Sequence, residues 1–544
     1  MEIFKYCSLT LAVLVAVCAP IAAQTDIVKS DGINSALHQA NVGRIVFTAK
    51  PSDAEVGESD FVLSTDLSKP TVLSFRAFLI NSLTNYLHRL APQLTVDELN
   101  QRGNYQFSYL IDGKLIHKEN LNPFWLPSEN KIKQTIFRGT LFDPADPDRP
   151  LWKLFLLNGG DDALTAGTHR VRIELRPYVR SPELKVGELI AAGDLQIIVP
   201  KSATNKQATR IQSIRSESGW EISKASYDRR RIEDLNRKIA TNLFRNITSV
   251  VVIKNGKLLI EEYFNGASRD MLHNTRSVGK SFASTMMGIA IDDGFIKSEN
   301  QTLKDFYDLR KFANFSPKKE TVTIKSLLTM SSAFNGNDDD EDSPGNEEKM
   351  YPTNDWVKFA LDVPMSERNV GDKWAYFTAG AVILGDIINR SVPRGLEKYA
   401  DEKLFQPLGI TKYEWPYTPQ RVPSTAGGLK MRALDFAKYG QLYQNGGRWN
   451  GKQVVPAPWV EKTFTKQMPV GDDAYGYLFW YRTFNLEGKN YETFYASGNG
   501  GNKIFVFRDQ PLVVVITSTA FGTWYMHQQV SIMMERYILP AVLK

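Results

Sequence analysis

The stretch Asn274-Thr275-Arg276-Ser277-Val278-Gly279-Lys280-Ser281-Phe282 decides which fold this chain is expected to have. It places a serine hydroxyl and a lysine amine three positions apart, at the head of an apolar segment (282–291) that reads as a buried helix. Positions i and i+3 share one helix face, so the Lys280 amine can lie beside the Ser277 oxygen. A buried, neutral lysine there would take the serine proton and create a nucleophile.

Context separates this Ser-x-x-Lys from two others in the chain. Ser128-Glu129-Asn130-Lys131 and Ser316-Pro317-Lys318-Lys319 lie in polar, loop-like surroundings with no apolar helix behind them. The pattern is short enough to arise by chance, and only Ser277 has the helix that the chemistry requires.

Residues 1–23 read as a secretory signal peptide. Lys5 precedes an apolar core (9–19), and Ile21-Ala22-Ala23 offers small residues for cleavage before Gln24. We therefore expect an exported protein, periplasmic or secreted, with an uncleaved anchor as the alternative. Val17, which is not a small residue, precedes Cys18 and argues against a lipoprotein.

Both cysteines, Cys7 and Cys18, fall inside this segment. The mature chain would then have no disulfide, no cysteine nucleophile and no thiolate metal site. No later run approaches the roughly 20 apolar residues of a membrane helix, so we expect no transmembrane segment in the mature chain.

Length and charge set the broad class. A chain of 544 residues exceeds one hydrophobic core, so two domains are expected. The 66 basic and 60 acidic residues are spread along the chain, so the charge distribution does not indicate a nucleic-acid partner.

Residues 24–200 predict a β-rich module. Short apolar or alternating runs at 44–48, 105–111, 152–157 and 169–175 are separated by turn signals such as Asp112-Gly113, with one amphipathic piece (78–87) that reads as a short helix. We expect an all-β, sandwich-like architecture. The sequence of this module contains no recognisable catalytic or metal-binding motif. It is therefore interpreted as a structural or recognition module whose ligand, if any, is unknown.

A polar linker (201–226) leads to a second domain, 227–544. A basic amphipathic helix (227–239) is followed by a hairpin at Asn255-Gly256, and two more strands (503–507 and 512–517) and a closing helix (524–539) lie near the end. Mostly helical segments lie between. We therefore expect an α+β domain whose antiparallel sheet is assembled from both ends, with Ser277 where sheet and helices meet.

Further segments follow Ser277-Val278-Gly279-Lys280 in a recognisable order: 323–332, 406–410, Ala426-Gly427-Gly428-Leu429, 435–442 and 449–456. With them, the chain from about Tyr227 to its end resembles the serine β-lactamase and penicillin-recognising superfamily. The branch it is most similar to contains class C β-lactamases, esterases and 6-aminohexanoate-dimer hydrolases. The resemblance implies a sheet flanked by helices and an acyl-enzyme formed on the serine.

The resemblance also implies a catalytic tyrosine from a Tyr-x-Asn motif. Tyr376-Phe377-Thr378 stands in its place, with Thr378 where the asparagine is expected. A phenol beside an ammonium group is driven towards phenolate. Tyr376 and Lys280 would share the acid and base work on Ser277.

The third element of the family is a Lys-Thr-Gly or His-x-Gly motif on the strand at the edge of the site. The chain has Ser497-Gly498-Asn499-Gly500-Gly501-Asn502-Lys503 there, with Asn499 in the cationic position. Glycines let the strand approach substrate closely. By the same resemblance, the amides of Ser277 and Asn502 would form the oxyanion hole. Without the cation, we expect a neutral ester or amide substrate rather than a β-lactam.

Two other features receive structural interpretations. The acidic loop 337–342 lacks the glycine and glutamate of a helix-loop-helix calcium site, since Ser343 and Lys349 stand in those places, so a solvated loop near the mouth of the site is favoured. His273 has no evident aspartate partner, and we expect it to be structural. No metal and no organic cofactor is expected.

The sequence thus predicts an exported serine hydrolase that cleaves a small ester, amide or peptide through Ser277, Lys280 and Tyr376, with Thr378, Asn499, Gly500, Gly501 and Asn502 around the substrate. The alternative is a catalytically weak binding protein that captures a cell-wall peptide or similar ligand.

Overall fold

A computed structural model describes residues 25–201 and 209–543. The predicted signal peptide, with both cysteines, lies outside the described residues. The chain divides into two compact units, Met1–Ser202 and Ala203–Lys544, which are described separately here.

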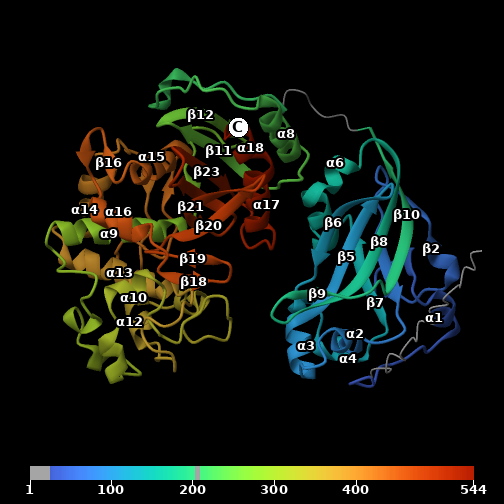
Figure 1. Cartoon of the computed structure of the whole chain (residues 1–544). Helices are drawn as coiled ribbons and strands as arrows, with labels where there is room; N and C mark the ends of the chain where they lie inside the picture. The colour runs from blue at the N-terminus through green and yellow to red at the C-terminus, as the bar shows by residue number, and fades with distance from the viewer. Residues whose placement is uncertain (1–24, 202–208, 544) are drawn as a thin grey trace, which may run out of the picture. The chain divides into compact units, whose positions relative to one another are not determined.

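The amino-terminal unit contains two sheets (Figure 1). The first has the order β2-β1-β4-β7, and the second has the order β3-β10-β8-β5-β6, with β9 beside β8. The strands are β1 (Ile45–Thr48), β2 (Phe61–Val62), β3 (Ser64–Asp66), β4 (Leu73–Phe78), β5 (Gly103–Ile111), β6 (Lys114–Asn120), β7 (Ile136–Phe142), β8 (Gly167–Arg180), β9 (Leu184–Val186) and β10 (Ala191–Val199). Phe75 from one sheet and Phe107 from the other share one buried core, where their rings meet edge to face.

Helices in the same unit mean that the predicted all-β sandwich is not confirmed. They are α1 (Ala36–Asn41), α2 (Leu83–Leu90), α3 (Val96–Arg102), α4 (Ser128–Lys133), α5 (Pro150–Phe155) and α6 (Asp161–Ala163). The run 152–157, predicted as a strand, is helical because Pro150 stands at the first position of α5, where its fixed φ favours a helix. A capping box between Thr95 and Glu98 starts α3.

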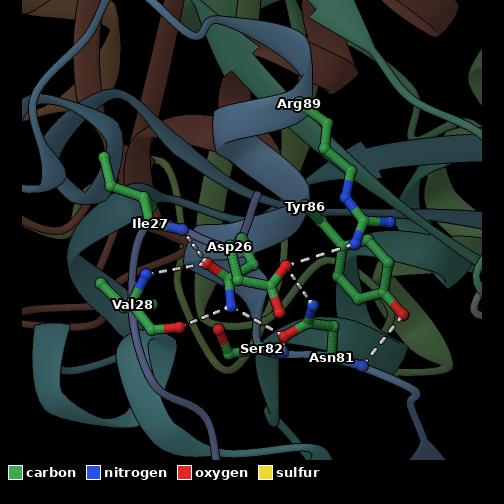
Figure 2. Close-up of polar contacts among 8 residues, drawn as sticks. Asp26, Ile27, Val28, Asn81, Ser82, Tyr86 and Arg89 are labelled. Atoms are coloured by element: carbon green, nitrogen blue, oxygen red, sulfur yellow. Dashed lines mark hydrogen bonds and ion pairs between the residues drawn. The ribbon is translucent and has the colours of Figure 1, made fainter. Parts of the chain in front are cut away.

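The first described residues are held against α2 by side chains instead of by a sheet (Figure 2). The Oδ1 of Asn85 accepts the amides of Ile27 and Val28 at 3.0 and 3.1 Å, and its Nδ2 donates to the Val28 carbonyl at 2.9 Å. Asp26 accepts from Asn81 Nδ2 at 2.8 Å and pairs with Arg89 at 3.4 Å. The Asn85 side chain thus satisfies backbone groups of this segment.

The carboxy-terminal unit is built on a sheet of order β12-β11-β23-β22-β21-β20-β19-β18, which combines strands from both ends of the unit as predicted. The strands are β11 (Ile247–Lys254), β12 (Lys257–Tyr263), β18 (Met468–Val470), β19 (Asp473–Tyr475), β20 (Trp480–Leu486), β21 (Lys489–Gly498), β22 (Asn502–Phe507) and β23 (Leu512–Ser518). The predicted hairpin is confirmed: Asn255 and Gly256 both have positive φ, as the tight turn between β11 and β12 requires.

Helices pack on this sheet and form the inserted region. The longer ones are α8 (Arg229–Ala240), α9 (Val278–Asp292), α12 (Trp356–Asp362), α13 (Thr378–Ser391), α15 (Ala433–Gln444), α16 (Ala457–Thr463) and α17 (Met526–Met533). Helix α15 packs on β11, β22 and β23, while α9 contacts both α13 and the end of β21 (Figure 1). The predicted closing helix continues from α17 through a π-helical turn (Met534–Ile538) to α18 (Leu539–Val542).

Within the described ranges, no helix has the length and apolar character that crossing a membrane requires.

Candidate active site

The predicted Ser277 and Lys280 pair is present at the start of α9. Ser277 is the N-cap of this helix, and Lys280 Nζ lies 2.9 Å from Ser277 Oγ. Lys280 is 1 % exposed, and its Nζ also donates to the Ala426 carbonyl oxygen at 2.6 Å. Helix α9 is buried along almost its whole length, which fixes the backbone that carries both side chains.

The turn before the nucleophile is tightly constrained. Arg276 has φ +55°, a left-handed conformation that costs a non-glycine residue about 1–2 kcal/mol. Gly428 compensates by donating its amide to the Arg276 carbonyl at 3.0 Å. A Cβ at Gly427 would lie 2.7 Å from that same oxygen, so only glycine fits. The Ala426-Gly427-Gly428 segment found in the sequence therefore supports both the serine turn and Lys280.

Gly498, the last residue of β21, brings the sheet against the nucleophile. A Cβ on Gly498 would lie 1.9 Å from the Thr275 carbonyl oxygen and 3.1 Å from the Ser277 amide nitrogen. Any side chain at Gly498 would collide with the serine turn, so strand and turn are packed backbone to backbone.

Ser277 opens into a cavity of about 440 Å³. Aromatic side chains line part of its wall, and the Tyr376 and Trp480 rings stack with centroids 6.0 Å apart. The remaining lining is mostly polar or charged: Asp338, Asp339, Glu347, Asp473, Arg482, Ser497, Asn499, Lys503, His527 and Ser531. The cavity therefore combines an apolar aromatic surface with ionic groups around a serine.

Tyr376, the predicted catalytic tyrosine, lies close to the Ser277 and Lys280 pair. It lines the same cavity as Ser277, and Lys280 Nζ lies 5.2 Å from the centroid of its ring. Thr378, in the expected asparagine position, is fully buried as the first residue of α13 and does not line the cavity. Its amide donates to Asp338 Oδ2 at 2.8 Å. The structure thus brings Tyr376 to the site but directs Thr378 into the protein.

Only part of the glycine-rich loop after β21 lines the cavity. Asn499 lines the cavity, and its Oδ1 accepts the Gly522 amide at 2.8 Å. Gly500 and Gly501, both with positive φ, make the turn to β22 and do not line the cavity. Asn502 is also absent from the lining: its side chain is fully buried and ties this turn to Ser518 of β23. Gly498 of this segment abuts the Ser277 amide.

Cationic residues that the sequence did not assign to the site come from neighbouring strands. Lys503 of β22 lines the cavity, is 7 % exposed and hydrogen-bonds Ser497 Oγ. Burial, reinforced by the charge of Arg482, lowers the pKa of Lys503 to about 7. Arg482 of β20 also lines the cavity and donates to Ser531 Oγ at 2.6 Å. The reason for expecting a neutral substrate, the missing cation at Asn499, is therefore removed.

The predicted acidic loop reaches the mouth of the cavity, where Asp338 and Asp339 are part of the lining. Burial raises the pKa of Asp338 to about 6, although hydrogen bonds from Thr378 and the charge of Lys280 act in the opposite direction. Sequence reasoning placed this loop near the site but gave Asp338 no role, because its position against α13 depends on tertiary packing.

His273 lies outside the cavity lining. Its Nδ1 is within 3.2 Å of Thr248 Oγ1 and 3.1 Å of Thr517 Oγ1, and burial lowers its pKa to about 4. These contacts join β11, β23 and the short strand β13 (His273–Asn274), in agreement with the structural interpretation. Among residues 25–201 and 209–543, no group of three or more histidine, cysteine, aspartate or glutamate side chains is arranged to hold a metal ion.

Comparison with known proteins places this site in a family. The Beta-lactamase family model matches residues 236–529. The protein PbpX of Bacillus subtilis (strain 168), which carries a provisional penicillin-binding-protein name, is 23% identical over 38% of this chain and 52% of its own length. An uncharacterized protein of Alkalihalophilus pseudofirmus is 20% identical over 41% of this chain and 65% of its own length. The chain therefore spans less than two thirds of either curated relative.

A solved structure of a family VIII carboxylesterase has 18% sequence identity and a TM-score of 0.45, and the match covers 59% of this chain and 98% of that one. The family match is the stronger finding, since it spans more than half of the 544 residues and contains Ser277, Lys280, Tyr376 and Gly498. This chain belongs to the β-lactamase family.

Proposed function

We propose that this protein is an exported serine hydrolase that cleaves an ester or amide through an acyl-enzyme on Ser277. The observation that carries the proposal is the 2.9 Å contact between Lys280 Nζ and Ser277 Oγ, in which a buried lysine contacts a serine that lines a cavity large enough for a small ligand.

In the proposed reaction, Ser277 Oγ attacks the substrate carbonyl while Lys280, with Tyr376, accepts the serine proton. The proton passes to the leaving alcohol or amine as its bond to the carbonyl carbon breaks. Water then attacks the acyl-enzyme, gives its proton to the same pair, and releases the acid as Ser277 regains its hydrogen.

The developing oxyanion needs donors that are fixed in advance. The Ser277 amide lies at the amino terminus of α9, where the helix dipole favours negative charge. Gly498 holds the end of β21 directly against that amide. We assign the oxyanion hole to the Ser277 amide and the main chain at this strand end, in preference to the Asn502 amide expected from the sequence.

The cavity supports a substrate that carries an anionic group. Lys503 and Arg482 line it beside four carboxylates, and an anion next to the two cations would accept charge-assisted hydrogen bonds from them. Trp480 and Tyr376 offer an apolar surface for the rest of the ligand. A small ester, amide or peptide with a carboxylate fits this arrangement better than the neutral substrate expected from the sequence.

A second candidate is a catalytically weak protein that captures a cell-wall peptide or similar ligand. Two observations favour it: Thr378, which replaces the family's asparagine, is directed away from the cavity, and the Bacillus relative bears a penicillin-binding name. Such a protein would acylate at Ser277 without repeated turnover.

The test is a burst and steady-state assay of the mature protein with a chromogenic short-chain ester, beside Ser277→Ala, followed by intact-mass measurement. Sustained turnover that disappears in Ser277→Ala supports the hydrolase. A stable acyl adduct without turnover supports the binding protein instead. Equal activity in both proteins rules out Ser277 as the nucleophile.

A further inference from the structure

We propose that Asp338 is a positioning residue that holds Tyr376 in place through the main chain on either side of Phe377. This inference rests on the proposed role of Tyr376 and adds a residue to that same site. Asp338 lies in the acidic loop, far from Tyr376 in sequence, and its carboxylate borders the cavity.

Two hydrogen bonds connect Asp338 to the tyrosine segment. The Asp338 amide donates to the Tyr376 carbonyl oxygen at 2.8 Å, and Asp338 Oδ2 accepts the Thr378 amide at 2.8 Å. These two contacts bracket Phe377, so the main chain on both sides of Phe377 is held by one residue. Because Thr378 is the first residue of α13, the carboxylate also lies at the positive end of a 14-residue helix.

The other carboxylate oxygen is engaged as well. Asp338 Oδ1 accepts the Glu347 amide at 2.8 Å, at the start of α11 (Glu347–Met350), and the Asp338 carbonyl accepts Asn346 Nδ2 at 3.2 Å. Both oxygens of the side chain therefore receive backbone N–H groups. An ionised carboxylate accepts at both positions without presenting a donor, whereas an asparagine would turn an NH2 group towards one of the two amides.

The surroundings of this carboxylate raise the pKa of Asp338 to about 6. The titratable groups around it are Glu347 and Tyr351 at α11, Lys280 at α9, Tyr376 before α13, and Asp339 within the loop. Burial favours the neutral acid, whereas Lys280 and the amide donors favour the carboxylate. Protonation near pH 6 would remove the negative charge and place an O–H on one of the two oxygens, which weakens the hydrogen bond that this oxygen accepts from a backbone amide.

The consequence is specific to Tyr376. When Asp338 loses one acceptor, the segment from Tyr376 to Thr378 loses a restraint, and the phenol moves relative to Ser277 and Lys280. A misplacement of about 1 Å in a catalytic group is enough to lower turnover by about 100-fold. Substrate contacts elsewhere in the cavity are unaffected, so kcat changes more than KM.

The test compares Asp338→Asn with Asp340→Asn in the mature protein, each alone and combined with Tyr376→Phe. Asp340 is an exposed member of the same loop and lies outside the cavity lining, and its side chain accepts the Asp342 amide, which an asparagine oxygen also accepts. We expect Asp338→Asn to lower kcat about 10- to 100-fold with KM within threefold, and Asp340→Asn to stay within twofold. In the Tyr376→Phe background, Asp338→Asn should have almost no further effect.

Thr378→Pro provides a second variant in case Asp338→Asn does not fold. Proline is favoured at the first position of a helix, and Phe377 already has the extended backbone that a residue before proline needs. The substitution deletes the N–H that Asp338 accepts while it leaves the carboxylate intact. We expect a similar loss of kcat. When Thr378→Pro is combined with Tyr376→Phe, kcat should fall no further than in Tyr376→Phe alone.

The pH profile gives a readout that a purely structural role would not change. The acid limb of kcat near pH 6 should be present in the parent protein and in Asp340→Asn but absent in Asp338→Asn. If the effects of Asp338→Asn and Tyr376→Phe multiply, or if Asp338→Asn retains parental kcat and pH profile, the proposal is overturned. If Ser277→Ala remains active, the proposed function itself fails, which is a different result.

Discussion

Lys280 Nζ lies between two oxygens, 2.9 Å from Ser277 Oγ and 2.6 Å from the Ala426 carbonyl. The Ala426 carbonyl gives the amine a second, buried hydrogen bond, so the lysine cannot leave its position without breaking it. The Ser-x-x-Lys motif thus depends on the distant Ala426-Gly427-Gly428 segment for its geometry.

Replacing Lys280 should remove proton transfer while leaving Ser277 in place. We expect Lys280→Met to lower kcat/KM for a short-chain ester by about 10²–10⁴-fold, the usual contribution of general acid–base catalysis. Lys280→Arg keeps the charge but cannot act as a base near neutral pH, so it should be similarly inactive. Steady-state kinetics and thermal unfolding would check this. An active Lys280→Arg would show that charge alone suffices.

Gly498→Ala tests the contact between β21 and the serine turn. The added Cβ would lie 1.9 Å from the Thr275 carbonyl oxygen, so strand and turn must separate and the Ser277 amide must move. We expect a loss of kcat of at least about 100-fold. Gly57→Ala is a suitable control, since a Cβ there meets nothing within 4 Å and its φ is −111°. Parental activity in Gly498→Ala would refute the close packing.

Lys503 predicts a pH dependence that distinguishes anionic from neutral substrates. Its pKa is about 7 in the protein, and a bound carboxylate favours its charged form, so binding at pH above 7 takes up a proton. We expect KM for a carboxylate-bearing ester to rise between pH 7 and 9, while KM for the matching methyl-capped ester stays constant. Lys503→Met should raise KM for the anionic ester and abolish its pH dependence. Identical KM profiles for both esters would argue against an anion site.

His273 should contribute to acid denaturation without taking part in catalysis. Its folded-state pKa is depressed to about 4, so its stabilising contribution is complete above the unfolded pKa near 6.5 and is lost as the pH falls towards 4. The shift corresponds to about 3 kcal/mol. His273→Asn cannot titrate, so its stability relative to the parent should improve from pH 7 to pH 4.5 in urea unfolding. A large loss of kcat in this variant at pH 7 would contradict the structural role.

Local pattern was sufficient to predict the parts of the site that are close in sequence. Ser277 and Lys280 share one face of a helix whose apolar character is visible in the sequence, and Tyr376 precedes another such helix. The Asn255-Gly256 turn was predictable for the same reason, because its backbone conformation depends on those two residues.

Features that depend on strand register could not be predicted in this way. Lys503 reaches the cavity because it pairs with Ser497 across β21 and β22, and Arg482 because β20 pairs with β21. A register shift of one residue would turn either side chain to the other face of the sheet. For Asn502, the order of residues in the motif predicted that its amide is an oxyanion donor. In the structure, its side chain hydrogen-bonds Ser518 of β23, a contact that also depends on strand pairing.

The central pairing of the sheet has a consequence for biosynthesis. Strand β11 pairs with β23, with Val251 opposite Val515, so the centre of the sheet cannot form until β23, which ends at Ser518, has been synthesised. Contacts this distant in sequence slow folding. They also mean that a nascent chain bearing Ser277 has no β21 to close its active site. The site around Ser277 is therefore incomplete until β21 and β23 have been synthesised and have paired with the rest of the sheet.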